Sequence, residues 1–243
     1  MPIRKSGDQK YYELLTKIPR SVTEETAKHY RQSDSVLDDP AHTDVGNALT
    51  RICRSLNRPL TVLDLGCGCG RHFRFLEGAE KIVGVDVSEE MLKQAEHPAG
   101  EEMVRASIDL KCGDFFAMDF PDNGFDLIYS AGVFGLWVPM DDYILRKIRS
   151  WLKPDGVALL VVIDAKTPVT ETWKSRLSIK FGKYMPESIQ RRIDARPGSR
   201  FLRLYEHELK ALLTDAGLDF TIWHRGDPKR RVDLVCEFRK KTN

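Results

Sequence analysis

The chain has 243 residues, enough for one α/β domain with an additional cap. Its residues are 42% hydrophobic and 30% charged, a balance typical of globular proteins in water. A formal net charge of only +2 gives no global argument for a nucleic acid or a membrane as partner. The longest apolar run, Val157 to Ile163, is far too short to cross a bilayer, and the first residues contain no apolar core of a signal peptide. We therefore expect a cytoplasmic protein without membrane contact.

The chain has five cysteines, an odd number, and their spacing is not that of a disulfide framework, so we predict that they are reduced thiols. Cys67 and Cys69 form a C-x-C pair, which raises the alternative of a metal site. Both lie in a glycine-rich turn, however, and no second pair of Cys or His stands at zinc spacing. The prediction is therefore that no metal is bound.

Residues 1–59 predict a helical N-terminal cap. Apolar residues recur at helical spacing from Tyr11 to Ile18, and Pro19 ends that pattern. A second helix is predicted from Thr23 to Tyr30, with a weak capping box at its start. The composition of Ser33 to Asp44 indicates a loop, and Val45 to Leu56 a helix that leads into the next domain.

From residue 60 onward, strands alternate with helices. The predicted strands are Thr61–Leu65, Lys81–Asp86, Ile108–Cys112, Phe125–Ser130 and Val157–Ile163, and the predicted helices are Arg71–Leu76, Glu89–Glu96 and Asp142–Leu152. This alternation favours right-handed βαβ units and a parallel sheet. The chain then changes pattern: a helix, Glu206–Ala216, precedes two strands, Phe220–Trp223 and Val232–Phe238, which are joined by a hairpin connection.

The glycine-rich turn follows the first predicted strand as Asp64-x-Gly66-x-Gly68-x-Gly70. Glycine is required where the backbone lies against a ligand, and a helix start favours an anionic group. A nicotinamide or flavin fold would place a third glycine where this chain has Arg71. The spacing therefore argues against a dinucleotide.

A second acid, Asp86, ends the second predicted strand about twenty residues past the turn, where it can accept both hydroxyls of a ribose. The turn, this strand end and three later segments resemble the class I (Rossmann-like) S-adenosylmethionine (SAM)-dependent methyltransferase family. The three segments are Lys111–Phe115, Phe125–Gly132 and Trp151–Gly156. The resemblance covers residues 60 to about 238.

The resemblance implies an α/β fold: a doubly wound, seven-stranded, mostly parallel sheet with an antiparallel last strand. A SAM-binding methyltransferase domain would span 60–243 behind the cap, with an insert at about 165–203 after strand five. SAM would be the cofactor. The residues expected to bind it are Asp64, Gly66, Cys67, Gly68, Asp86, Val87, Met91, Gly113, Asp114, Phe115, Ser130, Ala131 and Val133.

Several of these residues have a plain structural alternative. Asp64 could be a turn residue, and Met91 could simply pack in the core. Asp114 is expected to bind the adenine amino group, and its alternative role is that of a helix N-cap. Cys69 stands where the family commonly has Thr or Ser; its side chain is still small.

The acceptor is expected at the carboxyl ends of the strands. Asp164 is the one weak catalytic candidate there, either as a base or as the holder of an acceptor amine. Trp137 would stack on a flat or cationic acceptor, and Tyr30 in the cap would close over SAM. Ordinary loop packing is the alternative for these side chains.

The insert is strongly basic, and Arg191 and Arg192 within it are predicted to bind an anionic acceptor through arginine forks. A solvated helix face is the alternative, and RNA binding is another.

The sequence favours methyl transfer to a small-molecule acceptor. An RNA or protein methyltransferase is an alternative. The family members that methylate amino groups of bases carry an Asn/Asp-Pro-Pro-aromatic motif after strand four, whereas this chain reads Ser130-Ala131-Gly132-Val133 there, which argues against that type. A non-catalytic SAM-binding regulatory or support protein is another. The acceptor atom and the oligomeric state are not specified by the sequence.

Overall fold

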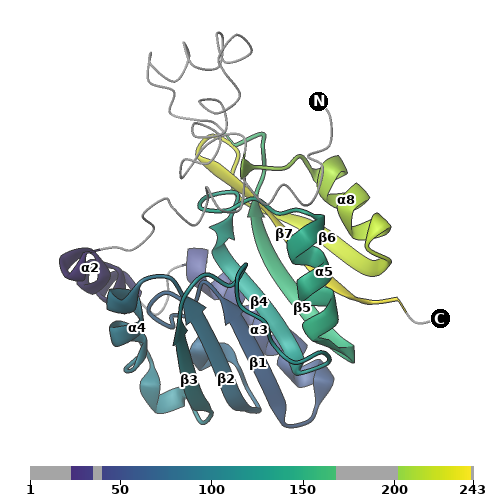
Figure 1. Ribbon diagram of the computed structural model, residues 1–243. Helices are drawn as coiled ribbons and strands as arrows, with labels where there is room; N and C mark the ends of the chain where they lie inside the picture. Colours follow the sequence, from purple (N-terminus) through teal and green to yellow (C-terminus); the bar gives the residue numbers. More distant parts are fainter. Residues whose placement is uncertain (1–22, 35–39, 168–201, 242–243) are drawn as a thin grey trace.

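The computed structural model describes residues 23–34, 40–167 and 202–241 (Figure 1). Its strands are β1 (Leu60–Leu65), β2 (Ala79–Asp86), β3 (Ser107–Cys112), β4 (Phe125–Phe134), β5 (Leu152–Ile163), β6 (Leu218–Asp227) and β7 (Arg231–Lys240). Its α-helices are α2 (Glu24–Asp34), α3 (Pro40–Leu56), α4 (Glu89–Ala95), α5 (Asp142–Trp151) and α8 (Glu206–Asp215). None of these helices is long and apolar enough to cross a membrane.

The seven strands form one sheet in the order β3-β2-β1-β4-β5-β7-β6. The first five strands run parallel, and β7 is antiparallel to both of its neighbours. The predicted fold class is confirmed. Because β6 runs in the same direction as β5, the carboxyl ends of β1, β2, β4, β5 and β6 all lie along one edge of the sheet, the carboxyl edge.

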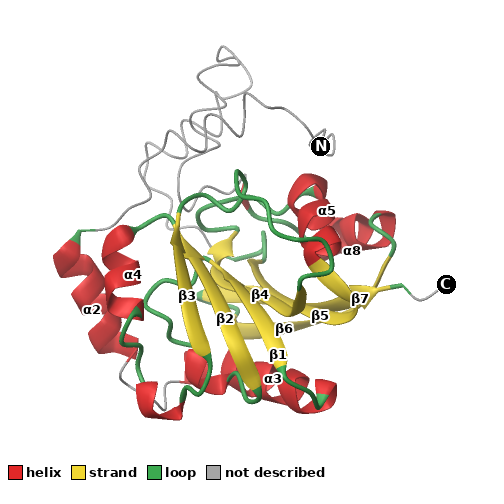
Figure 2. Cartoon of the chain, turned by 60° about the horizontal axis from the view of Figure 1, so that its bottom comes forward, coloured by secondary structure: helices red, strands yellow, loops and turns green. Residues whose placement is uncertain are grey.

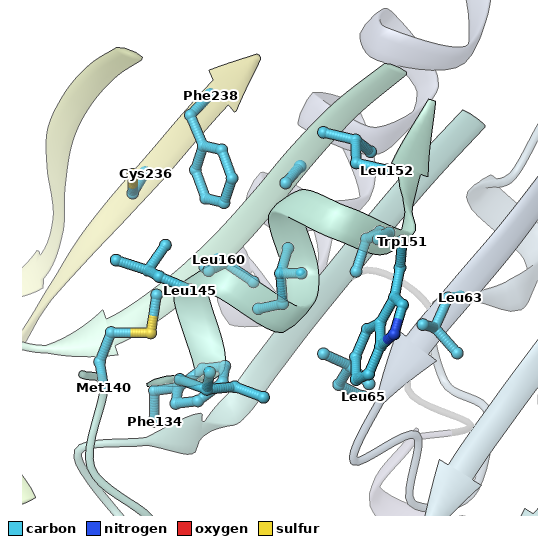
Figure 3. Packing of buried hydrophobic residues seen from close by; sticks show 14 of the residues in the cluster. Leu63, Leu65, Phe134, Met140, Leu145, Trp151, Leu152, Leu160, Cys236 and Phe238 are labelled. Carbon is cyan, nitrogen blue, oxygen red and sulfur yellow. The ribbon is translucent and has the colours of Figure 1, made fainter. Parts of the chain in front are cut away.

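Helices cover both faces of the sheet (Figure 2). On one face, α5 and α8 pack through Ile144, Ile148 and Leu209 on a core that includes residues of every strand except β3. Figure 3 shows Trp151 of α5 within this core, where its indole lies beside Leu65 of β1. We call this side the α5–α8 face; the other side, covered by α3 and α4, is the α3–α4 face.

At the amino edge of the sheet, Asp126 of β4 holds three segments together. Its carboxylate is fully buried and accepts hydrogen bonds from the Thr61 amide (2.9 Å), from the Arg58 guanidinium (2.9 Å) and from the Lys153 ammonium (2.8 Å). Because Thr61 lies near the start of β1 and Lys153 lies in β5, this one side chain holds the three central strands together, at the edge opposite the predicted site.

Two local predictions were wrong. Only a 3₁₀ turn, Phe73–Phe75, forms where a helix from Arg71 to Leu76 was expected. The helical conformation ends at Leu76, which has φ −88° and ψ +67°, and Gly78 follows in a left-handed conformation directly before β2. The expected loop from Ser33 to Asp44 becomes helical at Pro40, since proline suits the first turn of a helix.

The N-terminal part of the chain is described only in α2 and α3. The Thr23 hydroxyl accepts a hydrogen bond from the Thr26 amide (3.2 Å), so the predicted cap of this helix forms. The division of the chain into a cap and a domain at residue 60 stays a prediction.

Candidate cofactor and acceptor site

The glycine turn leaves β1 in a backbone conformation that favours glycine. Gly66, Gly68 and Gly70 have φ angles of +79°, +54° and +73°. A Cβ atom on Gly66 would also lie far inside van der Waals contact with Val133 Cγ2 of β4. The turn is fixed to β2 because the amides of Gly66 and Cys67 both donate to the Val85 carbonyl, at 2.8 and 2.9 Å.

Asp86, the last residue of β2, connects the turn to helix α4. Its Oδ2 accepts a hydrogen bond from the Gly68 amide (2.9 Å), and its Oδ1 accepts one from the Ser88 amide (2.9 Å). Burial raises the pKa of Asp86, although these amides oppose the shift. Each carboxylate oxygen has a second lone pair. The geometry thus leaves acceptor capacity for two hydroxyl groups beside the turn, which fits the ribose of the predicted cofactor.

Asp64 lies beneath the same turn and is only 3% exposed. Burial raises the pKa of Asp64 to about 8, and the neighbouring Tyr129 hydroxyl and Arg71 guanidinium oppose the shift. Tyr129 is itself buried on β4, directly opposite Asp64 in the sheet. The sequence did not single out Tyr129, because its nearness to Asp64 depends on the pairing of β1 with β4.

Helix α2 reaches the turn from the N-terminal region. The Cys69 thiol donates to the Ala27 carbonyl (3.7 Å), and its sulfur lies 3.6 Å from Met91 Sδ. Both Ala27 and Cys69 are buried. The two cysteines of the C-x-C pair therefore pack inside the protein, and the described residues contain no cluster suited to a metal ion. Tyr30 belongs to α2, but its side chain lies outside the described residues.

The segment after β3 lies beside Asp86, since the Gly113 amide donates to the Asp86 carbonyl (2.8 Å). Asp114 Oδ1 accepts the Phe116 amide (2.9 Å), so this carboxylate organises its own turn; no helix begins there, so Asp114 is not the helix N-cap of the alternative interpretation. Phe115 is buried and stacks on Phe116, with ring centroids 4.9 Å apart. Val87, which directly follows Asp86 at the end of β2, is half-buried.

At the end of β4, Ser130 is fully buried and its hydroxyl donates to the Leu65 carbonyl (2.6 Å). Its side chain therefore ties β4 to β1 directly before the glycine turn. Ala131 is half-buried and packs toward the α3–α4 face, whereas Trp137 packs toward the α5–α8 face. A Cβ at Gly132 would meet no atom within 4 Å, so the backbone borders open space here, a feature that the sequence did not indicate.

Asp164 follows the last residue of β5 and is fully buried. Its Oδ1 accepts a hydrogen bond from the Lys166 amide (2.8 Å). Its Oδ2 lies 3.8 Å from Nε2 of His224, and the same nitrogen lies 3.2 Å from Glu206 Oε2. The sequence analysis placed His224 in a hairpin connection, but the structure places it in β6, at the carboxyl edge.

The predicted insert is described only at its two ends. Arg191 and Arg192 fall within 168–201, outside the described residues. The cofactor and acceptor roles of all these side chains stay predictions; the structure brings Asp64, the glycine turn, Asp86, Gly113 and Val133 together at one place.

Comparison with known proteins relates this chain to methyltransferases. A family model described as a methyltransferase domain matches residues 62–156. A demethylmenaquinone methyltransferase of Listeria welshimeri is 30% identical over 174 residues, which are 68% of this chain and 70% of that protein. The phosphoethanolamine N-methyltransferase 3 of Arabidopsis thaliana is 32% identical over 132 residues, which are 53% of this chain and 26% of that protein. The chain thus spans only about a quarter of the Arabidopsis enzyme, and it spans 50% of a sterol 24-C-methyltransferase from Gibberella zeae.

The solved structures that resemble this chain carry the same fold. The 1,6-didemethyltoxoflavin-N1-methyltransferase of Burkholderia thailandensis, which holds 1,6-didemethyltoxoflavin and S-adenosylhomocysteine, superposes with a TM-score of 0.56 at 17% identity. The match covers 99% of this chain and 94% of that one. At that identity the likeness shows the fold alone.

Proposed function

Because this chain belongs to the class I SAM-dependent methyltransferases, with SAM as its cofactor, we propose that it transfers a methyl group from SAM to a small-molecule acceptor. One observation supports the proposal most directly. The carboxylate of Asp86 accepts the amides of Gly68 and Ser88 and keeps further acceptor capacity beside three glycines in left-handed conformations.

The residues that would hold SAM come from the ends of four neighbouring strands. Asp86 would accept the ribose hydroxyls, and the glycine turn would lie against the amino-acid end of the cofactor. Asp64 and Asp86 place two carboxyl groups near a ligand that carries positive charge, which favours the ionised form of both. Gly113 to Phe115 and Met91 border the same place and would contact the adenine.

SAM supplies a methyl group already activated by a sulfonium, so the organic chemistry belongs to the cofactor. The task of the protein is to orient the acceptor and to exclude water. The open backbone at Gly132 and the ring of Trp137 lie at the carboxyl edge, where an acceptor would be oriented. A base is needed only when the acceptor must lose a proton before it attacks, and Asp164 stays the candidate for this role.

The acceptor class follows from the relatives rather than from the site. Those named above act, by their names, on phosphoethanolamine, sterols and demethylmenaquinone, all of them small molecules. An anionic group on the acceptor stays a prediction that depends on Arg191 and Arg192. A cytoplasmic location also belongs to the proposal, and the five cysteines, all free thiols, agree with a reducing compartment.

Calorimetric titration with SAM and with S-adenosylhomocysteine tests the cofactor step. Micromolar affinity for either is expected, and release of S-adenosylhomocysteine in the presence of candidate acceptors then tests transfer. A folded, reduced protein that binds neither compound would overturn the proposal. Binding without transfer to any small molecule would favour a regulatory or support role.

A further inference from the structure

Three polar side chains from distant parts of the chain meet at the carboxyl edge of the sheet. They are Asp164 after β5, Glu206 at the start of α8 and His224 near the end of β6. Alternate residues of a strand share a face. Val162 precedes Asp164 and Ile222 precedes His224 by two residues, and both pack in the core of the α5–α8 face. The three side chains therefore lie on one face, where helix α8 begins.

The carboxylate of Asp164 is not fully satisfied. It is 0% exposed, and its Oδ2 accepts no hydrogen bond from any described residue. The His224 imidazole faces this oxygen, but its Nε2 at 3.8 Å is too far for a hydrogen bond. An ionised carboxylate that is buried without a donor is costly, so this oxygen keeps an unmet capacity to accept a hydrogen bond, which a ligand with an N–H donor would satisfy.

The second carboxylate is already ionised and faces the same point. Hydrogen bonding to the Lys210 ammonium lowers the pKa of Glu206. Lys210 contacts Oε1 at 2.6 Å, whereas Oε2 faces His224 at 3.2 Å. Lys166, the other cation nearby, is exposed, and only its backbone amide bonds to Asp164. Two carboxylate oxygens thus converge on a single imidazole nitrogen.

We propose that Asp164, Glu206 and His224 form the subsite that binds the ammonium group of an amine acceptor. An ammonium has three N–H donors and a full positive charge, so it can satisfy Asp164 Oδ2 and Glu206 Oε2 together. The imidazole of His224, with 46% of its side chain exposed, forms the outer wall of the subsite. The cluster contains three side chains of types that can bind metals, but no group among the described residues, this one included, is arranged to hold a metal ion.

This inference rests on the proposed methyl transfer and narrows its substrate class to amines. An ammonium nitrogen has no free lone pair, so the bound group would first pass one proton to the carboxylate of Asp164 or Glu206, and the neutral nitrogen would then attack the methyl group of SAM. The subsite lies near the predicted cofactor site, because a Cβ on Gly135, just after β4, would lie 2.9 Å from the amide nitrogen of Ile163, directly before Asp164.

The test is a titration of the full-length protein, in the presence of S-adenosylhomocysteine, with ethanolamine and with ethylene glycol. Ethylene glycol has a similar size but replaces the ammonium with a hydroxyl. The chain has six histidines, so the His224 ring signal can be followed by NMR and assigned with His224→Gln. Ethanolamine is expected to shift this signal saturably, and ethylene glycol is expected to leave it unchanged.

Two variants locate the binding. Asp164→Asn should weaken the ethanolamine response about tenfold or more, because a charge-assisted hydrogen bond is lost. Glu206→Gln should also weaken the ethanolamine response. Because Glu206 is less buried than Asp164, this variant still tests the subsite if Asp164→Asn does not fold. Asp215→Asn removes an exposed carboxylate from the other end of α8 and should leave the titration unchanged.

Equal responses to the two ligands, no response to ethanolamine, or the same titration in Glu206→Gln and Asp215→Asn would overturn the subsite. Failure of the wild-type chain to bind S-adenosylhomocysteine, with the ethanolamine response intact, would instead overturn the proposed function and leave the subsite standing.

Discussion

At the scale of single residues, Asp86 is the side chain on which cofactor binding depends most directly. Asp86→Asn replaces one acceptor oxygen with a donor and removes the charge. We expect SAM affinity to fall by about 1.5–3 kcal/mol, the usual worth of a hydrogen bond to a charged group. Calorimetry measures this loss. Asp109→Asn, on the neighbouring strand and paired only with surface lysines, is the matched control. An unchanged affinity in Asp86→Asn would refute the ribose assignment.

Asp64 should make stability depend on pH. The pKa of Asp64 is about 8 in the folded chain, against the ordinary aspartate value of 3.8 in the unfolded chain. Between these values the folded state holds a proton that the unfolded state has lost, so the stability from this group is complete below the lower value and disappears as the pH rises through about 8. Asp64→Asn removes this titration.

We therefore expect Asp64→Asn to gain stability relative to the wild type as the pH rises from about 5 to about 9. Urea unfolding of both proteins across this range gives the difference, in which the other titrating groups cancel. A difference that stays constant with pH would show that Asp64 is ionised in the folded protein throughout.

Gly66 is expected to tolerate no side chain. Gly66→Ala places a Cβ in a left-handed conformation, at a cost of about 1–3 kcal/mol, and adds a collision with Val133. Gly217→Ala is the matched control: φ is +65° there, and no atom lies within 4 Å of the new Cβ. Urea unfolding should show a clearly larger loss at Gly66, partly recovered by a second change, Val133→Ala. Equal losses at the two glycines would mean that the turn can move away from β4.

At the scale of secondary-structure elements, the Asp126 contacts and the predicted cofactor site lie at opposite edges of the same strands. Asp126→Asn removes the buried charge partner of Arg58 and Lys153, whose side chains stay partly exposed, so we expect a loss of about 1.5–3 kcal/mol, the usual worth of a hydrogen bond to a charged group. Asp155→Asn is the control: Asp155 also pairs with Arg58, but its side chain is 63% exposed, so the expected loss is at most about 1 kcal/mol.

Unfolding in urea and SAM titration together check this prediction. We expect Asp126→Asn to lower stability and to leave SAM affinity nearly unchanged wherever the protein is folded. A parallel loss of both would mean that the strands transmit the change from one edge of the sheet to the other.

At the scale of the whole molecule, the sequence predicted the features that depend on neighbouring residues. The glycine turn, Asp64 and Asp86 stand out because strand, turn and helix follow one another within a few residues. Tyr129 and His224 did not stand out, since their partners Asp64, Asp164 and Glu206 are distant in the chain and meet only through strand pairing. The helix expected at Arg71 to Leu76 is reduced to a 3₁₀ turn, because the backbone leaves the helical conformation at Leu76 and turns at Gly78 into β2, which the apolar spacing did not indicate.

The burial of the thiols has a practical consequence for chemical labelling. Of the five cysteines, only Cys112 is exposed, and burial raises the pKa of Cys53 to about 12 and that of Cys67 well above its usual range. Because the thiolate is the nucleophile, a maleimide dye should attach at Cys112 alone in the folded protein. Cys112 ends β3 opposite Asp86, so the dye would report cofactor binding from beside the predicted ribose position. A chain with five thiols would behave toward such a reagent as a chain with one.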